Sequence, residues 1–268
     1  MHRRRWVLLA TISTVVILVV VLVLSIRVIP VATYYRVRLG SGGTIVRIVQ
    51  VSDLHLRGFG YFEERVVELV AEAEPSLVVF TGDYVEDPSD AVYLDRFLEL
   101  LRRRLGSVHI YAVLGNWDLQ RGGEKVVRVL RKYGVELLVN SFDVVEVSGI
   151  RVVVVGFDDY LWGSPNLSII AGLPGADLYL ALVHEPVLAK SLTEKGFRGL
   201  IFAGHCHGGQ VKILGIPLYL PRGCPRDLYE GLHKLGGSVV VISRGVGSSL
   251  LPSRIGVDPE VVIVDVEI

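Results

Sequence analysis

The sequence has little cysteine and no excess of charge of either sign. Its two cysteines, Cys206 and Cys224, are too few for a disulfide framework and do not form a CxxC zinc pair. The chain has 28 basic and 28 acidic residues, so its formal net charge is zero. It therefore lacks the basic footprint of a nucleic-acid binder, and we expect no nucleic-acid partner. Internal repeats and low-complexity segments are also missing.

Charge is also missing from a long N-terminal run. The 21 residues from Trp6 to Ile26 contain no Asp, Glu, Lys or Arg, and a helix of that length spans a bilayer. Three arginines precede the run and one follows it, which favours a cytoplasmic N-terminus. We therefore predict a single-pass protein of the cell membrane. Residues 1–29 would form a cytoplasmic tip and transmembrane anchor, and residues 30–268 a folded domain on the extracytoplasmic side.

Three alternatives to this anchor stay open, one of which is a buried helix of the core. A cleaved signal peptide would also begin with arginines and an apolar run, although no Ala-x-Ala cleavage site lies near Pro30. The three consecutive arginines also fit a twin-arginine export signal.

The folded domain is predicted to be α/β. Apolar runs of strand type alternate with helical spacing in its first half, and strands dominate its second half. The predicted strands are Thr33–Leu39, Thr44–Ser52, Ser76–Thr81, Val108–Leu114, Val135–Val139, Asp143–Val147, Arg151–Gly156, Asp177–Val183, Gly199–Ala203, Val211–Ile213, Ser238–Ser243 and Val261–Ile268. The predicted helices are Phe62–Glu74, Asp90–Arg104, Glu124–Tyr133 and Pro186–Lys195. This order indicates two packed sheets with helices outside.

Side chains that can bind metal follow five of these strands. They are Asp53, His55, Asp83, Asn116, His184, His205 and His207. In open α/β sheets, ligands bind beyond the carboxyl ends of the strands, so neighbouring strands would bring these groups into one crevice. Imidazole suits zinc, iron or nickel, and carboxylate suits manganese. The sequence therefore predicts two divalent metal ions, of Mn, Fe, Zn or Ni.

Taken one at a time, most of these residues have a purely structural explanation. Asp53, Asp83 and Asn116 fit ordinary turns, and His184 fits a buried histidine of the core. Two histidines between glycines, in Gly204-His205-Cys206-His207-Gly208-Gly209, are poor packing units and are harder to explain in this way. Five strand ends that all carry such groups favour a functional site.

The motifs resemble those of the calcineurin-like metallophosphoesterase superfamily. The pattern appears as Asp53-Leu54-His55, Gly82-Asp83, Gly115-Asn116-Trp117-Asp118, His184 and Gly204-His205-Cys206-His207. Ser243-Arg244-Gly245-Val246-Gly247 is in addition similar to the membrane-associated YkuE/YaeI-type branch. The resemblance covers residues 44–268. It implies a four-layer αββα sandwich and a metallophosphoesterase catalytic domain over residues 30–268.

The resemblance also implies a role for each residue. Asp53, His55 and His207 would bind one metal, and Asn116, His184 and His205 the other. Asp83 would bridge the two, together with a hydroxide that attacks phosphorus in line. Asp83, Asn116 and Asp118 would be catalytic, with Asp118 an orienting group or a proton donor, although it also fits a plain turn residue. Trp117, Gln210, Arg244 and Arg254 are candidates for substrate contacts, although the arginines also fit surface salt bridges.

One position departs from the family pattern. Trp117 stands where the family has a histidine that serves the leaving group, and indole cannot act as a general acid. The predicted function is hydrolysis of phosphodiesters, phosphomonoesters or pyrophosphates, including lipid-linked ones. The alternative is a non-catalytic metal-binding scaffold. Cys206 is expected to be a buried small residue, with a disulfide to Cys224 as the alternative.

Overall fold

The computed structural model describes residues 6, 11, 14, 26–121 and 123–268 of the chain. The predicted anchor, residues 6–26, lies almost wholly outside the described residues. Its last residue, Ile26, belongs with Arg27 to a short strand, β1. Among the described residues, none of the helices has both the length and the apolarity that a bilayer span requires.

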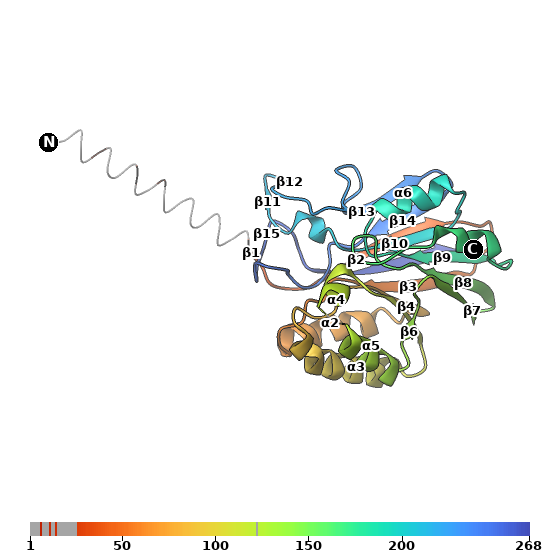
Figure 1. Ribbon diagram of the computed structural model, residues 1–268, viewed down its shortest axis with the longest axis horizontal. Coiled ribbons are helices and arrows are strands. Elements are labelled where there is room, and N and C mark those ends of the chain that lie inside the picture. The colour runs from red at the N-terminus through yellow and green to blue at the C-terminus, as the bar shows by residue number, and fades with distance from the viewer. Residues whose placement is uncertain (1–5, 7–10, 12–13, 15–25, 122) are drawn as a thin grey trace.

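Strands and helices follow the predicted order over most of the domain (Figure 1). The strands are β1 (Ile26–Arg27), β2 (Val31–Arg38), β3 (Ile45–Val51), β4 (Leu77–Thr81), β5 (His109–Val113), β6 (Glu136–Leu137), β7 (Ser141–Val147), β8 (Ile150–Gly156), β9 (Leu178–Leu182), β10 (Leu200–Ala203), β11 (Lys212–Ile213), β12 (Ile216–Pro217), β13 (Gly231–Leu235), β14 (Ser238–Ile242), β15 (Arg254–Ile255) and β16 (Glu260–Glu267). The helices are α2 (Tyr61–Glu72), α3 (Ala91–Leu105), α4 (Asn116–Gln120), α5 (Glu124–Lys132) and α6 (Val187–Glu194), with short 3-10 turns at Pro88–Asp90, Leu167–Gly172 and His207–Gly209.

The strands form two mixed six-stranded sheets. The first has the order β2-β16-β3-β4-β5-β6, in which β3 to β6 run parallel. The second has the order β13-β14-β10-β9-β8-β7, in which β14, β10, β9 and β8 run parallel. The last long strand, β16, lies beside β3 and runs antiparallel to it, so the end of the chain completes the centre of the first sheet.

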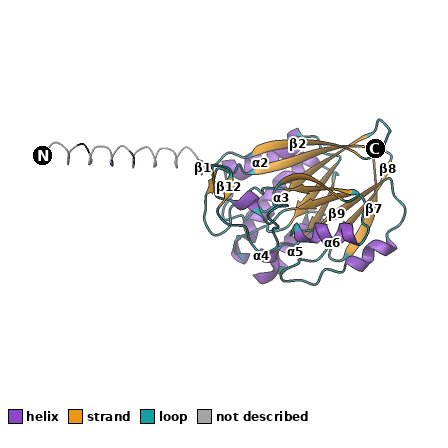
Figure 2. Cartoon of the chain, turned by 90° about the horizontal axis from the view of Figure 1, so that it is seen from above, coloured by secondary structure: helices purple, strands orange, loops and turns teal. Residues whose placement is uncertain are grey.

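Three apolar clusters divide the domain into helix, sheet, sheet and helix layers. One cluster packs α2, α3 and α5 on the first sheet, for example through Val66, Phe97 and Leu130. A second lies between the sheets, with Tyr111 on one side and Phe202 on the other. The third packs α6 on the second sheet. Helices accordingly lie on both outer faces of the strands in Figure 1, and Figure 2 shows the same layers from above. The fold is thus the predicted α/β type with two sheets and flanking helices.

Burial of the strands explains why their sequences read as apolar runs. β4 is Leu-Val-Val-Phe-Thr and is buried at all five positions, because α2 and α3 cover one face and the second sheet covers the other. Strands covered on both faces lack the polar alternation of a half-exposed strand. The polar side chains that follow β3, β4 and β5 then meet those that follow β9 and β10 at one edge of the molecule.

Candidate metal centre

The seven predicted residues come together in two adjoining clusters. In one, ligand atoms of Asp53, His55 and His207 all lie within 4.8 Å of one another, and in the other those of Asp83, His184 and His205 do. All six side chains are buried. Oδ2 of Asp83 lies 3.4 Å from Nε2 of His55 and 3.4 Å from Nε2 of His184. Asp83 therefore stands between the two clusters.

The backbone turns sharply at most of these residues. Five of the seven have a positive φ, namely Asp53, His55, Asp83, His205 and His207, with values from 40° to 68°. A residue with a β-carbon in this region costs on the order of 1–3 kcal/mol. Such strain persists only where the surrounding structure enforces it, and here it points successive side chains into one place.

A glycine allows the loops that follow β4 and β5 to approach each other closely at this edge. A β-carbon at Gly115 would lie 2.2 Å from Oδ1 of Asp83. The absence of a side chain also lets the Trp117 backbone N–H donate to that oxygen at 2.9 Å. The Gly115-Asn116 step therefore orients Asp83 as well as bringing Asn116 into the site.

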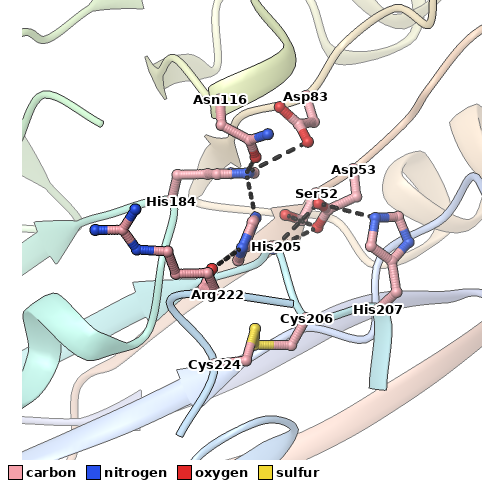
Figure 3. Close-up of a disulfide and its surroundings, with 10 residues drawn as sticks. All are labelled: Ser52, Asp53, Asp83, Asn116, His184, His205, Cys206, His207, Arg222 and Cys224. Atoms are coloured by element: carbon pink, nitrogen blue, oxygen red, sulfur yellow. Dashed lines mark hydrogen bonds and ion pairs between the residues drawn. A yellow bond between two sulfur atoms is a disulfide. The ribbon is translucent and has the colours of Figure 1, made fainter. Parts of the chain in front are cut away.

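Hydrogen bonds orient the imidazoles of the Asp83 cluster (Figure 3). Nδ1–H of His184 donates to the carbonyl oxygen of Thr81 at 2.6 Å. Nε2–H of His205 donates to the carbonyl oxygen of Arg222 at 2.8 Å. The remaining nitrogens, Nε2 of His184 and Nδ1 of His205, face each other at 3.2 Å. Oδ1 of Asn116 lies 3.1 Å from the same His184 nitrogen. Acceptors thus converge here, and only a proton or a cation would satisfy them.

The other cluster is oriented differently. Nδ1 of His55 lies 3.1 Å from Oε2 of Glu86, so its Nε2 carries the free lone pair. Arg254 donates to Nδ1 of His207 at 3.1 Å, which leaves the proton of neutral His207 on Nε2. That nitrogen lies 3.2 Å from Nε2 of His55. A cation bound in this cluster would therefore displace one ring proton.

The pKa values reflect the same crowding of acceptors. Burial opposes the charged imidazolium of His184, but the surrounding carboxylates, first Asp83 and then Glu185 and Asp53, together outweigh it and raise the pKa of His184 well above its usual value. Burial, and then His184, lower the pKa of His205 to about 4. Burial also works against ionised Asp83, yet His184 holds the pKa of that carboxyl at about 2. A positive charge beside Nε2 of His184 is therefore favourable, and a divalent ion fits this donor set.

Asp118 holds the Asp83 loop in place. Its buried carboxylate accepts hydrogen bonds from the backbone N–H groups of Asp83, Gly115 and Tyr84 at 2.9, 2.8 and 3.1 Å. Burial, followed by the charge of Asp83, raises the pKa of Asp118 to about 7. Three backbone donors use this carboxylate as an acceptor, so its placement fits the orienting role, which was one of the roles left open for it.

Trp117, which stands at the position where the resemblance implies a histidine, forms part of the wall of the site. Its ring meets that of His55 edge-on, with 5.5 Å between centroids. The guanidinium of Arg121 lies over the indole ring of Trp117, 4.0 Å from its centroid. Trp117 also lines the cavity described below, as a predicted substrate contact should.

The other three candidates for substrate contact are occupied by the protein itself. Gln210 lines the cavity, but its amide donates to the carbonyl oxygens of Ser249 and Leu251, both at 3.0 Å. Arg244 pairs with Glu260. Arg254 is only 2% exposed and binds the carbonyl oxygens of Arg244 and Gly247 in addition to His207. Their placement supports structural roles for the two arginines and gives their predicted contact with substrate no support.

Sequence reasoning missed several groups that orient the site. Glu86 lies three residues after Asp83, beside Asp87 and Pro88, and nothing in that loop sequence singles it out. Thr81 and Arg222 contribute carbonyl oxygens, which no side-chain pattern reveals. Cys206 and Cys224 form a disulfide, the alternative rather than the expected buried free cysteine. It ties the loop of His205 and His207 to the loop of Arg222 (Figure 3).

A cavity of about 560 Å³ opens above the two clusters. Asp83, Asn116, His205 and His207 form its polar floor. Its walls are mainly apolar, with Arg222 as a charged group beside them. This size and this lining are typical of small-molecule sites.

Converging acceptors at strand ends, under a cavity of this size, define a site of the metallohydrolase class. The chain belongs to the calcineurin-like phosphoesterase family, whose model matches residues 46–209, more than half of the chain. This confirms the predicted resemblance. The protein is therefore a metallophosphoesterase, a hydrolase of phosphoric esters, and belongs to a metal-dependent family.

Three relatives illustrate the match. The Bacillus subtilis metallophosphoesterase YkuE is 28% identical over 225 residues, covering 81% of this chain and 77% of its own. The Escherichia coli phosphodiesterase YaeI is 28% identical over 229 residues, covering 82% and 81%. A Danio rerio protein described as a transmembrane protein with a metallophosphoesterase domain is 27% identical over 233 residues. That match covers 81% of this chain and 52% of the Danio rerio protein.

The disulfide generates a prediction about stability and metal binding. Its cysteines are 18 residues apart, and closing a loop of that length stabilises a protein by about 3 kcal/mol. The double substitution Cys206→Ala with Cys224→Ala should lower the free energy of unfolding by about that amount in a denaturant titration. It should also weaken metal binding, measured by calorimetry, because the carbonyl partner of His205 is no longer tethered. Reduction of the unsubstituted protein should reproduce both effects. Unchanged unfolding and unchanged metal affinity would contradict this role.

Proposed function

We propose that the protein hydrolyses phosphodiesters, phosphomonoesters or pyrophosphates with a dinuclear metal centre. Asp53, His55 and His207 would hold one ion, and Asn116, His184 and His205 the other. Asp83 would be shared. The observation that carries this proposal is the position of Oδ2 of Asp83, at 3.4 Å from an imidazole nitrogen of each cluster.

Two divalent ions in these clusters would supply the positive charge that attracts phosphate oxygens and activates water. The chain's own groups would fix the geometry. Thr81, Arg222 and Glu86 hold three imidazoles in one orientation through hydrogen bonds to their other ring nitrogens. Ligands fixed in this way from behind keep metal sites rigid and raise the basicity of the coordinating nitrogen.

Side chains of the cavity wall would make the other contacts with the substrate. The guanidinium of Arg222 is exposed at the cavity and is suited to bind phosphate oxygens. Trp117 packs beside His55 and provides no titratable proton. The site therefore favours esters with a good leaving group, such as aryl phosphates or pyrophosphates, which need protonation least.

We also propose that residues 1–29 anchor the chain in the cell membrane and that residues 30–268 form the catalytic domain outside the cytoplasm. The uncharged run of residues 6–26 supports an anchor. The Cys206–Cys224 disulfide supports an oxidising compartment, where such bonds persist. A relative described as a transmembrane protein agrees with this arrangement.

Metal-dependent turnover is the first test. The full chain should hydrolyse bis-p-nitrophenyl phosphate when Mn²⁺, Zn²⁺, Ni²⁺ or Fe²⁺ is added. Asp83→Asn should lower kcat by about a thousandfold, since the group between the two clusters loses its charge. Asp95→Asn, on the outer surface of α3, should leave the rate unchanged. No turnover with any of the four metals would contradict the proposal.

The leaving group gives a second prediction. Trp117→His would place a proton donor on the cavity wall, and general acids contribute about 10²–10⁴ in rate. We expect a gain of about a hundredfold on dibenzyl phosphate, whose leaving group needs a proton, and less than threefold on bis-p-nitrophenyl phosphate. Trp117→Phe, as the control, should give neither gain. Equal gains on both esters would show that the leaving group does not limit the reaction.

Arg222 gives a third prediction. Arg222→Ala keeps the carbonyl oxygen that binds His205 but removes the guanidinium. The KM for bis-p-nitrophenyl phosphate should rise about tenfold, as expected for one charge-assisted hydrogen bond, while kcat changes little. Arg226→Ala provides the matched control, because Arg226 is exposed on the same loop but outside this cavity. If the KM of Arg222→Ala equals that of Arg226→Ala, the proposed contact between Arg222 and the substrate is excluded.

A further inference from the structure

Exposed apolar side chains gather on one rim of the molecule. Leu214, Ile216, Leu218, Tyr219, Leu250 and Leu251 are each more than 60% exposed, and we call them the apolar rim. Leu214, at the turn between β11 and β12, is 96% exposed. Single exposed leucines are common, but a contiguous apolar patch usually marks a binding surface.

The apolar rim is built as one unit. Strands β11 and β12 pair as a hairpin through Ile213 and Ile216. The side chain of Gln210, just before the hairpin, clamps the loop of Leu250 and Leu251 by bonding to backbone on both sides of Leu250. Gln210 therefore fixes the two halves of the apolar rim relative to each other.

The apolar rim continues into the catalytic cavity. Leu218, Tyr219, Leu250 and Leu251 line that cavity together with His205 and other site residues. A molecule that lies along the apolar rim would thus reach the candidate metal centre without crossing a polar surface.

The uncharged N-terminal run enters the domain at the same place. It ends at Ile26 in β1, and Ile26 pairs with Ile255 of β15. Ile255 itself lines the cavity, and Val211 bridges to it from the start of the hairpin. Strands β1, β15, β11 and β12 accordingly lie together at one end of the molecule in Figure 1. Paired residues of neighbouring strands lie about 5 Å apart, so the end of the run and the cavity wall adjoin.

We propose that the apolar rim rests on the surface of the lipid bilayer and admits lipid-linked phosphoesters from the membrane to the catalytic cavity. The attachment of a bilayer-length uncharged run beside Ile255 favours a membrane over a protein partner at this rim. Tyr219 and Trp162, both exposed and both lining the cavity, are of the kind that gather at membrane interfaces.

The substrate class rests on the proposed function. Hydrolysis would add water across one P–O bond of the lipid-linked ester. The water oxygen bonds to phosphorus, the bond from phosphorus to the leaving oxygen breaks, and the leaving oxygen takes up a proton. The headgroup would occupy the cavity of about 560 Å³, and the lipid chains would lie along the apolar rim toward the bilayer.

A fluorescence experiment tests the docking independently of catalysis. The full chain is reconstituted in phosphatidylcholine vesicles with either brominated or ordinary acyl chains. Leu214→Trp adds tryptophan emission to that of the unsubstituted chain. This additional emission should be at least about twofold lower in brominated than in ordinary vesicles. The emission added by Val92→Trp should not change, because Val92 is exposed on α3, away from the apolar rim. Equal emission from Leu214→Trp in both vesicles would overturn the proposal.

A kinetic experiment tests the substrate class. The double variant Leu214→Ser with Ile216→Ser changes two residues of the apolar rim that do not line the cavity. Its KM for the p-nitrophenyl ester of phosphatidic acid in vesicles should rise about tenfold, while turnover of soluble bis-p-nitrophenyl phosphate stays within twofold. Val92→Ser with Val144→Ser is the matched control and should change neither.

The outcomes separate the two proposals. Unchanged KM for the vesicle-borne ester in the rim variant would overturn delivery from the membrane while leaving the hydrolase intact. Absence of turnover on both esters by the unsubstituted protein, with every metal, would overturn the proposed function. The quenching result would then still decide whether the apolar rim meets the bilayer.

Discussion

The convergence of hydrogen-bond acceptors at one edge of the molecule is the constraint on which the rest of the site depends. Nε2 of His184 and Nδ1 of His205 face each other at 3.2 Å, with Asp83 beside them. Such an arrangement is unfavourable without a positive charge, so the fold must impose it. Positive φ angles, carbonyl partners behind the imidazoles and the disulfide all serve to hold the acceptors together. The strained backbone and the crowded acceptors lower the stability of the fold, but they produce a site that is complementary to cations.

The sequence predicted this cluster of acceptors because continuous apolar runs mark buried strands. Strands such as β4 and β10 are covered on both faces, so they appear as continuous apolar runs, and any polar residue directly after them stands out. All seven predicted ligand residues were found in this way, and the structure brings all seven together. The helices α2, α3, α5 and α6 were predicted to within about two residues, because one face of each carries apolar side chains at helical spacing.

The features that were missed have no local signal. Helix α4 has five residues and begins at Asn116, so its sequence looks like a turn. Strand β13 is a partly exposed edge strand, and only its antiparallel pairing with β14 defines it. The pairing of Cys206 with Cys224 depends on how two loops pack, and spacing along the chain does not reveal it. Arg254 was a candidate for a substrate contact because of its place in a family-like motif, with a surface salt bridge as the alternative, whereas the fold buries it behind His207.

The same electrostatics imply an order of binding. The site holds the carboxylates of Asp53 and Asp83, and a phosphoester brings further negative charge. Without cations these charges would repel, and the apolar walls of the cavity would strengthen the repulsion because they exclude water. Arg222 lines the cavity, but within the described part of the chain its hydrogen bond to the site is made by its backbone oxygen, which accepts from His205. Protonated His184 offsets part of this negative charge, and metal ions would offset more of it, so we expect metal binding to precede substrate binding. The apolar walls that make the metal-free site repulsive then become an advantage, because they strengthen the attraction between bound cations and phosphate.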